Sequence, residues 1–257
     1  MTNLIFDTHA HYDDESFDED RETLLSELPN KNIFSVVNAA ANIESSKKSV
    51  LIAKKYSYIY AAVGVHPENI SDMKFDYILE MKNMINECKK IVAIGEIGLD
   101  YHYSKSTKIE QLELFENQVK FALECNLPVI VHDREAHGDT LSVLKKYKPR
   151  GVVHCFSGSR DMAKEIIGLG MYLGIGGVVT FKNAKNIVNV VENVDLSKIV
   201  LETDAPYMTP VPFRGERCNS THIEFTAQKI AEIKNIDKYE VLKVTKKNAI
   251  DLFEIEV

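Results

Sequence analysis

Eight short apolar runs alternate with segments of helical spacing along the chain, and this rhythm restricts the fold more than any other feature. The runs are rich in Val, Ile or Ala and read LIFDTH, IFSVVNAA, IYAAVGVH, IVAIGEIGL, PVIVHD, GVVHCF, MYLGIGG and IVLETDAP. Continuous apolar runs are typical of strands buried on both faces, as in a parallel sheet covered by helices. Segments between them, such as 44–56 and 108–126, carry apolar residues at three-and-four spacing, which predicts amphipathic helices.

Strand and helix repeated eight times predict an α/β fold, a single (β/α)8 TIM barrel that spans residues 1–257 as one domain. Two consecutive helical segments, 222–235 and 237–253, follow the last run, so the barrel is expected to carry an extra C-terminal helix. A doubly wound open sheet is the alternative. That fold usually has a glycine-rich phosphate loop after its first strand, and this chain has none there.

The composition is that of an ordinary globular protein, with 45% hydrophobic and 27% charged residues in a chain of 257. Its four cysteines are widely spread and form no CxxC pair, which fits a reduced cytoplasm better than a disulfide framework. The stretch MTNLIF lacks the pattern of a signal peptide, and the apolar runs are too short to span a bilayer. We therefore expect a cytoplasmic protein with no membrane partner.

The net charge of −7 argues against a protein that coats long stretches of duplex, because such binding depends on neutralising many phosphates. It leaves open an enzyme that acts on one strand end, where bound metal ions supply the local positive charge. A binding module without enzymatic activity is disfavoured, because it would be expected to show a basic stripe with interleaved aromatic residues.

Ionisable side chains end five of the eight predicted strands, at the edge where TIM barrels carry their chemistry. They are His9 and His11, Glu96, His132, His154 and Asp204. His9 and His11 are two residues apart, so on a strand both rings point to the same face and can bind one metal ion. A single buried histidine is more often a hydrogen-bonded core residue. Five such strand ends favour a metal centre, because ionisable groups are seldom buried without a partner or a metal.

Six ligands of mixed nitrogen and oxygen type exceed one tetrahedral zinc site, so the sequence predicts two divalent metal ions. One grouping gives His9, His11 and Asp204 to the first ion. The second ion then takes the histidines that end strands five and six, and Glu96 bridges the two. Ions about 3.5–4 Å apart can activate a water and clamp a phosphoryl centre. The mixed ligation leaves zinc, manganese and magnesium open.

Two more acids, Glu202 and Asp7, lie two residues before a predicted ligand and share its strand face. Each is expected to support the centre from inside the barrel, by orienting a ligand histidine or, for Glu202, by pairing with Arg134. A plain salt bridge inside the barrel accounts for both acids equally well.

Three basic residues stand where a phosphate can reach them: His66 at the end of strand three, Arg134 at the end of strand five, and Arg214 on the loop after strand eight. Arginine suits bidentate phosphate recognition, and histidine can donate a hydrogen bond to phosphate. For Arg214, a solvated loop cation is an equal alternative. Phe156 lies two residues after a ligand histidine and is expected to stack on a base.

The stretches DTHAHYDD, GVHPE, IGEIGLDY, VIVHDREA, GVVHCFSGS and LETDAPYMTPVPFRG resemble the signature blocks of the TatD family of metal-dependent deoxyribonucleases. They occur in family order, and the ordered set is more specific than any single block. The resemblance implies a TIM barrel with a divalent-metal centre and metal-dependent hydrolysis of nucleic acid, commonly 3′→5′ exonuclease activity on single strands. By this resemblance, the metal ligands of the family correspond to the six strand-end residues named above. Many members have Asn-x-Pro after the RG element, whereas this chain reads RGERCNST, so no role is carried over to that loop.

The resulting prediction is a phosphodiester hydrolase that acts on a single-stranded nucleic acid end, DNA before RNA, and the sequence points to no stable protein partner. A water activated by two metal ions is the expected nucleophile, with Asp204 as general base and Glu96 as the catalytic bridge. The alternatives are an amidohydrolase acting on C–N or ester bonds and an ester hydrolase of aminoacyl-tRNA. Amidohydrolase barrels often bridge their metals with a carbamylated lysine, and no lysine ends strand four or five here.

Overall fold

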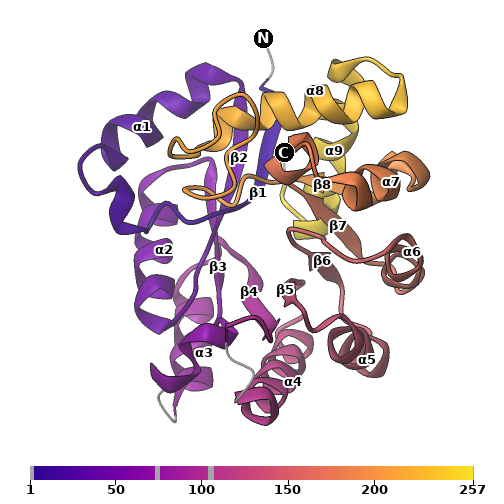
Figure 1. Ribbon diagram of the computed structural model, residues 1–257. Helices are drawn as coiled ribbons and strands as arrows, with labels where there is room; N and C mark the ends of the chain where they lie inside the picture. The colour runs from indigo at the N-terminus through magenta and orange to yellow at the C-terminus, as the bar shows by residue number, and fades with distance from the viewer. Residues whose placement is uncertain (1–2, 73–75, 104–106, 257) are drawn as a thin grey trace.

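The computed structural model describes residues 3–72, 76–103 and 107–256, in which eight parallel strands form one sheet in the order β1 to β8 (Figure 1). The strands are β1 Ile5–Ala10, β2 Ile33–Ala39, β3 Ile59–Val63, β4 Ile91–Asp100, β5 Val129–Arg134, β6 Gly151–Val153, β7 Tyr172–Ile175 and β8 Ile199–Leu201. Each apolar run matches one of these strands, and where a strand extends beyond its run it does so by one residue. The barrel prediction is confirmed, and the open-sheet alternative is wrong.

The first strand meets the segment that follows the last one, and this seam nearly closes the sheet into a barrel. Ala10 and Ala205 form a parallel bridge across the seam. The His11 N–H donates to the Ala205 carbonyl at 2.7 Å, and the Asp204 N–H donates to the His9 carbonyl at 2.9 Å. Backbone pairing at the seam therefore brings three of the predicted metal ligands together.

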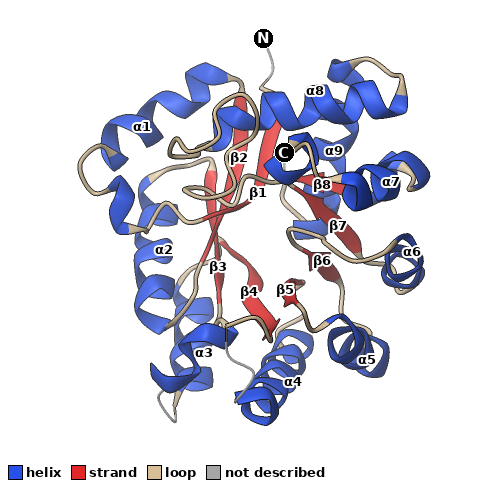
Figure 2. Cartoon of the chain, in the orientation of Figure 1, coloured by secondary structure: helices blue, strands red, loops and turns tan. Residues whose placement is uncertain are grey.

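Helices alternate with the strands and surround the barrel (Figure 2). They are α1 Arg21–Glu27, α2 Ile43–Lys55, α3 Tyr77–Glu87, α4 Lys108–Glu124, α5 His137–Tyr147, α6 Arg160–Gly168, α7 Lys185–Asn193, α8 Ile223–Lys234 and α9 Lys238–Phe253. Side-chain caps start several of them; the Asn42 side chain, for example, accepts the Ser45 N–H at the start of α2. None of the helices in the described ranges has the length and apolar character that a membrane span requires.

The predicted extra C-terminal helix, α9, packs against the N-terminal end of the barrel. Its residues Leu252 and Phe253 share a buried cluster with the second residues of several strands, among them Phe6 and Ile130. The rings of Phe6 and Phe253 stack with their centroids 6.0 Å apart. Burying an aromatic side chain contributes about 1.5–3 kcal/mol, so α9 stabilises this end and leaves the C-terminal ends of the strands open.

Strand β4 approaches β5 so closely that one position accepts only glycine. Gly98 pairs with His132, and a Cβ added at Gly98 would lie 2.0 Å from the His132 carbonyl oxygen. Its φ of +146° is also a conformation that favours glycine. The close approach places Glu96 of β4 beside His132 of β5.

Candidate metal centre

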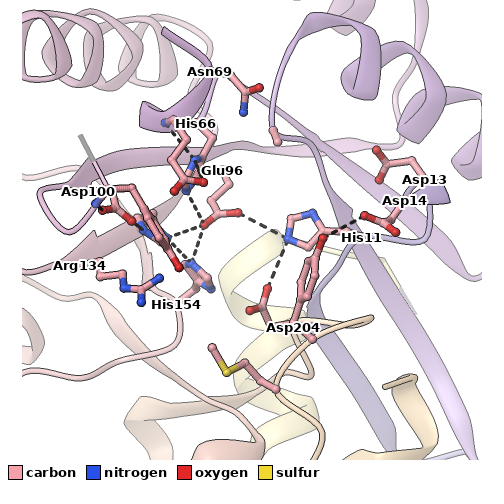
Figure 3. Close-up of a pocket in the computed structure, with 16 residues that line it drawn as sticks. His11, Asp13, Asp14, His66, Asn69, Glu96, Asp100, Arg134, His154 and Asp204 are labelled. Atoms are coloured by element: carbon pink, nitrogen blue, oxygen red, sulfur yellow. Dashed lines mark hydrogen bonds and ion pairs between the residues drawn. The ribbon is translucent and has the colours of Figure 1, made fainter. Parts of the chain in front are cut away.

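The six predicted ligands gather at the C-terminal end of the barrel. Five of them line a pocket of about 430 Å³ (Figure 3), and these are His11, Glu96, His132, His154 and Asp204. The sixth, His9, is fully buried, and its ring stacks on that of His154 with centroids 4.1 Å apart. These side chains come from strands β1, β4 and β5, from His11 directly after β1, and from the turns after β6 and β8.

The Glu96 carboxylate lies between two groups of histidines. Its Oε1 atom is 2.7 Å from His154 Nε2 and 2.8 Å from His132 Nδ1. Its Oε2 atom is 3.3 Å from His9 Nε2 and 3.6 Å from His11 Nε2. A carboxylate that turns one oxygen toward each group is arranged as a ligand that bridges two cations.

His9, His11 and Asp204 form one group at the seam. The Nε2 atoms of the two histidines are 3.0 Å apart, and Asp204 Oδ1 is 3.3 Å from His11 Nε2 and 3.6 Å from His9 Nε2. His11 Nδ1 donates to the Ala39 carbonyl at 2.9 Å, which leaves its Nε2 to face the group. Two imidazoles and a carboxylate that converge in this way fit a divalent cation.

His66 was predicted to contact a substrate phosphate, and the structure places it among the predicted metal ligands. Its Nε2 atom is 3.5 Å from Glu96 Oε1, and its ring meets that of His132 edge-on with centroids 4.4 Å apart. These three residues form a further group that could hold a cation. Burial lowers the pKa of His66 to about 3 despite the charge of Glu96, so the ring is neutral and has a lone pair to offer.

Negative charge in the cluster favours cations of any kind. Burial alone would lower the pKa of His11, but the hydrogen bond to Asp204 and the charge of Glu96 raise it to about 10. The pKa of His132 also rises to about 10 against the effect of burial, because Asp100 and Glu96 contact its ring. Burial raises the pKa of Glu96, but the surrounding histidines hold it well below its usual range. The carboxylates therefore stay ionised, and protons or metal cations balance them.

Asp100, the last residue of β4, supports the centre and was missed in the sequence. Its Oδ2 atom is 3.1 Å from His132 Nε2, and a proton shared there fixes the ring with Nδ1 toward Glu96. Its Oδ1 atom accepts the N–H groups of His102 and Tyr103. Asp100 lies four residues after Glu96 on one strand, so strand alternation was the signal that could have found it.

Glu202 is buried and contacts the turn that carries His154. It accepts the Cys155 N–H and lies 3.8 Å from His154 Nδ1. The glycine at position 174 makes room for it, because a Cβ on Gly174 would lie 2.2 Å from Glu202 Oε2. Burial raises the pKa of Glu202 to about 8. Among the described residues, no ion pair joins Glu202 to Arg134.

Asp7 is fully buried and ties β1 to the segment after β8. Its carboxylate accepts the Thr203 N–H at 3.0 Å, the Thr203 hydroxyl at 2.7 Å and the Ser220 hydroxyl at 2.7 Å. Burial raises the pKa of Asp7 to about 6 against these hydrogen bonds. These contacts hold the seam together just below the group that contains His9 and Asp204.

The predicted substrate contacts lie at different places. Arg134 lines the metal pocket, and its guanidinium is 4.6 Å from the centroid of the Tyr103 ring. Phe156 is 4% exposed and lines a second cavity of about 430 Å³ that adjoins the metal pocket. Arg214 is exposed, stacks over Phe181 at 3.7 Å and lines neither cavity. The structure therefore brings only Arg134 and His66 to the metal pocket itself.

Comparisons with known proteins cover nearly the whole chain. A sequence profile described as TatD related DNase matches residues 6–254. The uncharacterized metal-dependent hydrolase YabD of Bacillus subtilis (strain 168) is 38% identical over 255 residues, which cover 98% of this chain and 100% of YabD. The uncharacterized metal-dependent hydrolase YcfH of Escherichia coli (strain K12) is 32% identical over 259 residues, which cover 98% of this chain and 97% of YcfH.

A solved structure gives the same result in three dimensions. The crystal structure of YjjV, a TatD homolog from Escherichia coli K12, matches with a TM-score of 0.93 and 28% identity, and covers 100% of both chains. The cluster of candidate ligands at the strand ends, the relatives and the profile agree on a metal-dependent hydrolase. The chain belongs to the TatD-related DNase family.

Proposed function

We propose that this hydrolase cleaves phosphodiester bonds at an end of single-stranded nucleic acid, as a cytoplasmic 3′→5′ exonuclease on DNA. Its cofactors would be two divalent ions of magnesium, manganese or zinc. The observation that carries the proposal is the position of Glu96 between two histidine groups, because paired cations suit hydrolysis of a phosphodiester. Family membership supports nucleic acid as the class of substrate.

Six residues would hold the ions in two sets that share a carboxylate: His9, His11 and Asp204, then His132 and His154, with Glu96 between them. When bound, the ions make water a better nucleophile and offset charge on the phosphoryl oxygens. Asp204 accepts the proton of the attacking water. Burial raises its pKa, but the neighbouring histidines lower it below its usual range, so Asp204 stays ionised and ready to accept.

Arg134 is the side chain that we assign to the scissile phosphate. It lines the pocket and forms no ion pair within the described part of the chain, so its charge is available. A guanidinium group binds phosphate with two parallel hydrogen bonds. His66 is buried and neutral, so in this proposal it supports Glu96 or an ion more than it pairs with substrate. Phe156 and Arg214 stay predicted contacts for parts of the strand further from the centre.

A second candidate is an amidohydrolase or aminoacyl-ester hydrolase that uses the same centre. The crystal structure described as an uncharacterized amidohydrolase from Saccharomyces cerevisiae matches with a TM-score of 0.84 at 19% identity, which shows a shared fold alone. The described residues that line the metal pocket include no lysine that could be carbamylated. This favours the phosphodiesterase.

The decisive experiment compares linear and circular single-stranded DNA. Purified protein is incubated with 5′-labelled linear strands or with circles, in the presence of each metal separately. We expect a ladder of one-nucleotide steps from the 3′ end and intact circles. The Asp204→Asn variant, purified in parallel, excludes a contaminating nuclease. Rapid cutting of circles would show endonuclease activity, and turnover of an amide or aminoacyl ester without cutting of DNA would favour the second candidate.

A further inference from the structure

Two exposed tyrosine rings stand at the mouth of the metal pocket and have no part in the proposed chemistry. Tyr103 is 63% exposed and Tyr207 is 54% exposed, and both line the pocket. Phe156, the aromatic residue that the sequence favoured for stacking, is 4% exposed and can offer little of its ring. An aromatic ring must be open to solvent before a base can stack on it.

Both rings are held in place by residues of the metal pocket. The Tyr207 hydroxyl donates to Asp14 Oδ2 at 3.0 Å, and its ring lies 6.5 Å from that of His11. The Tyr103 ring lies against the Arg134 guanidinium, and the Tyr103 backbone N–H donates to Asp100 Oδ1 at 3.0 Å. One tyrosine therefore belongs to the His11 side of the centre, and the other to the side of Arg134.

The charge of the pocket mouth disfavours contacts with several phosphates. Four carboxylates beyond the predicted ligands line the pocket, with Asp14 and Glu68 at least partly exposed and Asp13 and Asp100 buried. Arg134 is the single arginine or lysine among the described lining residues. Phosphates on either side of the scissile one would meet negative charge here, which costs binding energy. The uncharged bases are the part of a strand that such a mouth accepts.

We propose that Tyr103 and Tyr207 are stacking platforms for the two bases that flank the scissile phosphate, so that the ligand recognised at the rim is an unpaired nucleobase. The proposal rests on the proposed function. Bases inside a duplex already stack on their neighbours, so the platforms select for single strands. Stacking then supplies the affinity that phosphate contacts supply in basic nucleases.

The test uses 2-aminopurine, whose fluorescence is quenched when it stacks. Manganese-loaded protein is titrated with a phosphorothioate oligonucleotide that carries the probe at the 3′-terminal or the preceding position. We expect quenching by the unmodified protein and by Tyr103→Phe and Tyr207→Phe, which keep the ring. Tyr103→Leu and Tyr207→Leu should lose the quenching at one position each and bind about 10-fold more weakly. Tyr239→Leu, at an equally exposed tyrosine on α9, is the control.

An abasic strand separates the two proposals. If the platforms exist, a strand without bases at those two positions binds the unmodified protein as weakly as the leucine variants bind a normal strand. Equal binding of normal and abasic strands, or unchanged quenching in both leucine variants, would overturn the platforms while cleavage continues. Failure of the proposed function gives the opposite pattern, with quenching and base preference intact but no strand cleaved under any metal.

Discussion

Asp204 combines metal binding with proton transfer in the proposed reaction. Its φ of +62° is uncommon for a residue other than glycine, and its N–H bond to the His9 carbonyl holds it there. Asp204→Asn keeps the shape and removes the proton acceptor. We expect kcat to fall about 100-fold or more, measured at saturating manganese with metal content determined in parallel. Asp161→Asn, on an exposed side chain, should leave kcat unchanged. Near-normal turnover in metal-replete Asp204→Asn would exclude this role.

The raised pKa values of His11 and His132 predict how metal binding depends on pH. In metal-free protein the pKa values of both rings lie at about 10. The stability that the protonated rings contribute is therefore complete below their usual pKa of 6.5 and is lost as the pH rises toward 10. Metal ions require the neutral rings and displace these protons. The Tm difference between manganese-loaded and EDTA-treated protein should therefore widen between about pH 6 and about pH 9. A constant difference would contradict the assignment of these ligands.

At the scale of elements, helix α4 holds two neighbouring strand ends through buried glutamines. The Gln111 side chain accepts the Asp100 N–H at 2.8 Å and donates to the Asp100 carbonyl at 2.9 Å. Gln118 does the same with Val65, at 2.8 and 2.9 Å. Both glutamines are fully buried. Helix α4 thus fixes the backbone that carries Asp100 and the backbone that leads into His66.

Replacing one of these glutamines should destabilise the protein. Gln118→Leu leaves the N–H and carbonyl of Val65 buried without a partner, and each such group costs about 1–3 kcal/mol. We expect the free energy of unfolding, measured with urea at fixed metal concentration, to fall by about 2 kcal/mol or more. Gln228→Leu on α8, where the side chain is exposed, should change it by less than about 0.5 kcal/mol. Equal effects of the two substitutions would argue against the clamp.

Apolar runs were sufficient to predict the strands, because a barrel strand is covered on both faces and its sequence shows this locally. Contacts between strands were harder to predict. The pairing of Asp100 with His132 depends on the register of β4 and β5, which shifts between Ile94 and Ile97. The place of His66 beside Glu96 depends on the path of the loop after β3. Neither register nor loop path is encoded in the pattern of a single segment.

For the whole molecule, the net charge of −7 and the acidic residues that line the pocket predict a weak dependence of substrate affinity on salt. Each phosphate neutralised on a single strand contributes about 0.7 to the slope of log affinity against log salt. With one or two such contacts, affinity for a single strand should fall by only about 3- to 7-fold between about 50 and about 200 mM salt. Fluorescence titration of metal-loaded protein measures this. A loss of about 1,000-fold, as in proteins with many phosphate contacts, would contradict the proposed mode of binding.

The fold class was predictable because the strand rhythm repeats along the chain, and the strand-end residues supplied the six predicted ligands. The grouping around Glu96 was also predicted from the strand ends, but the contact of each Glu96 oxygen with particular histidines depends on the folded barrel. The exposure of Tyr103 and Tyr207 also follows from the finished barrel and not from their neighbours in sequence.

The seam between β1 and the segment after β8 has a consequence for the protein during its synthesis. Asp7 and Thr203 form a hydrogen bond across the seam but lie 196 residues apart in the sequence, so the ribosome synthesises Asp7 long before Thr203. A nascent or prematurely terminated chain therefore carries His9 and His11 without Asp204, and its open strand edges mark it for chaperones and proteases. In the proposed mechanism hydrolysis needs Asp204, so we expect no activity from a chain that has not yet been translated past the last strand.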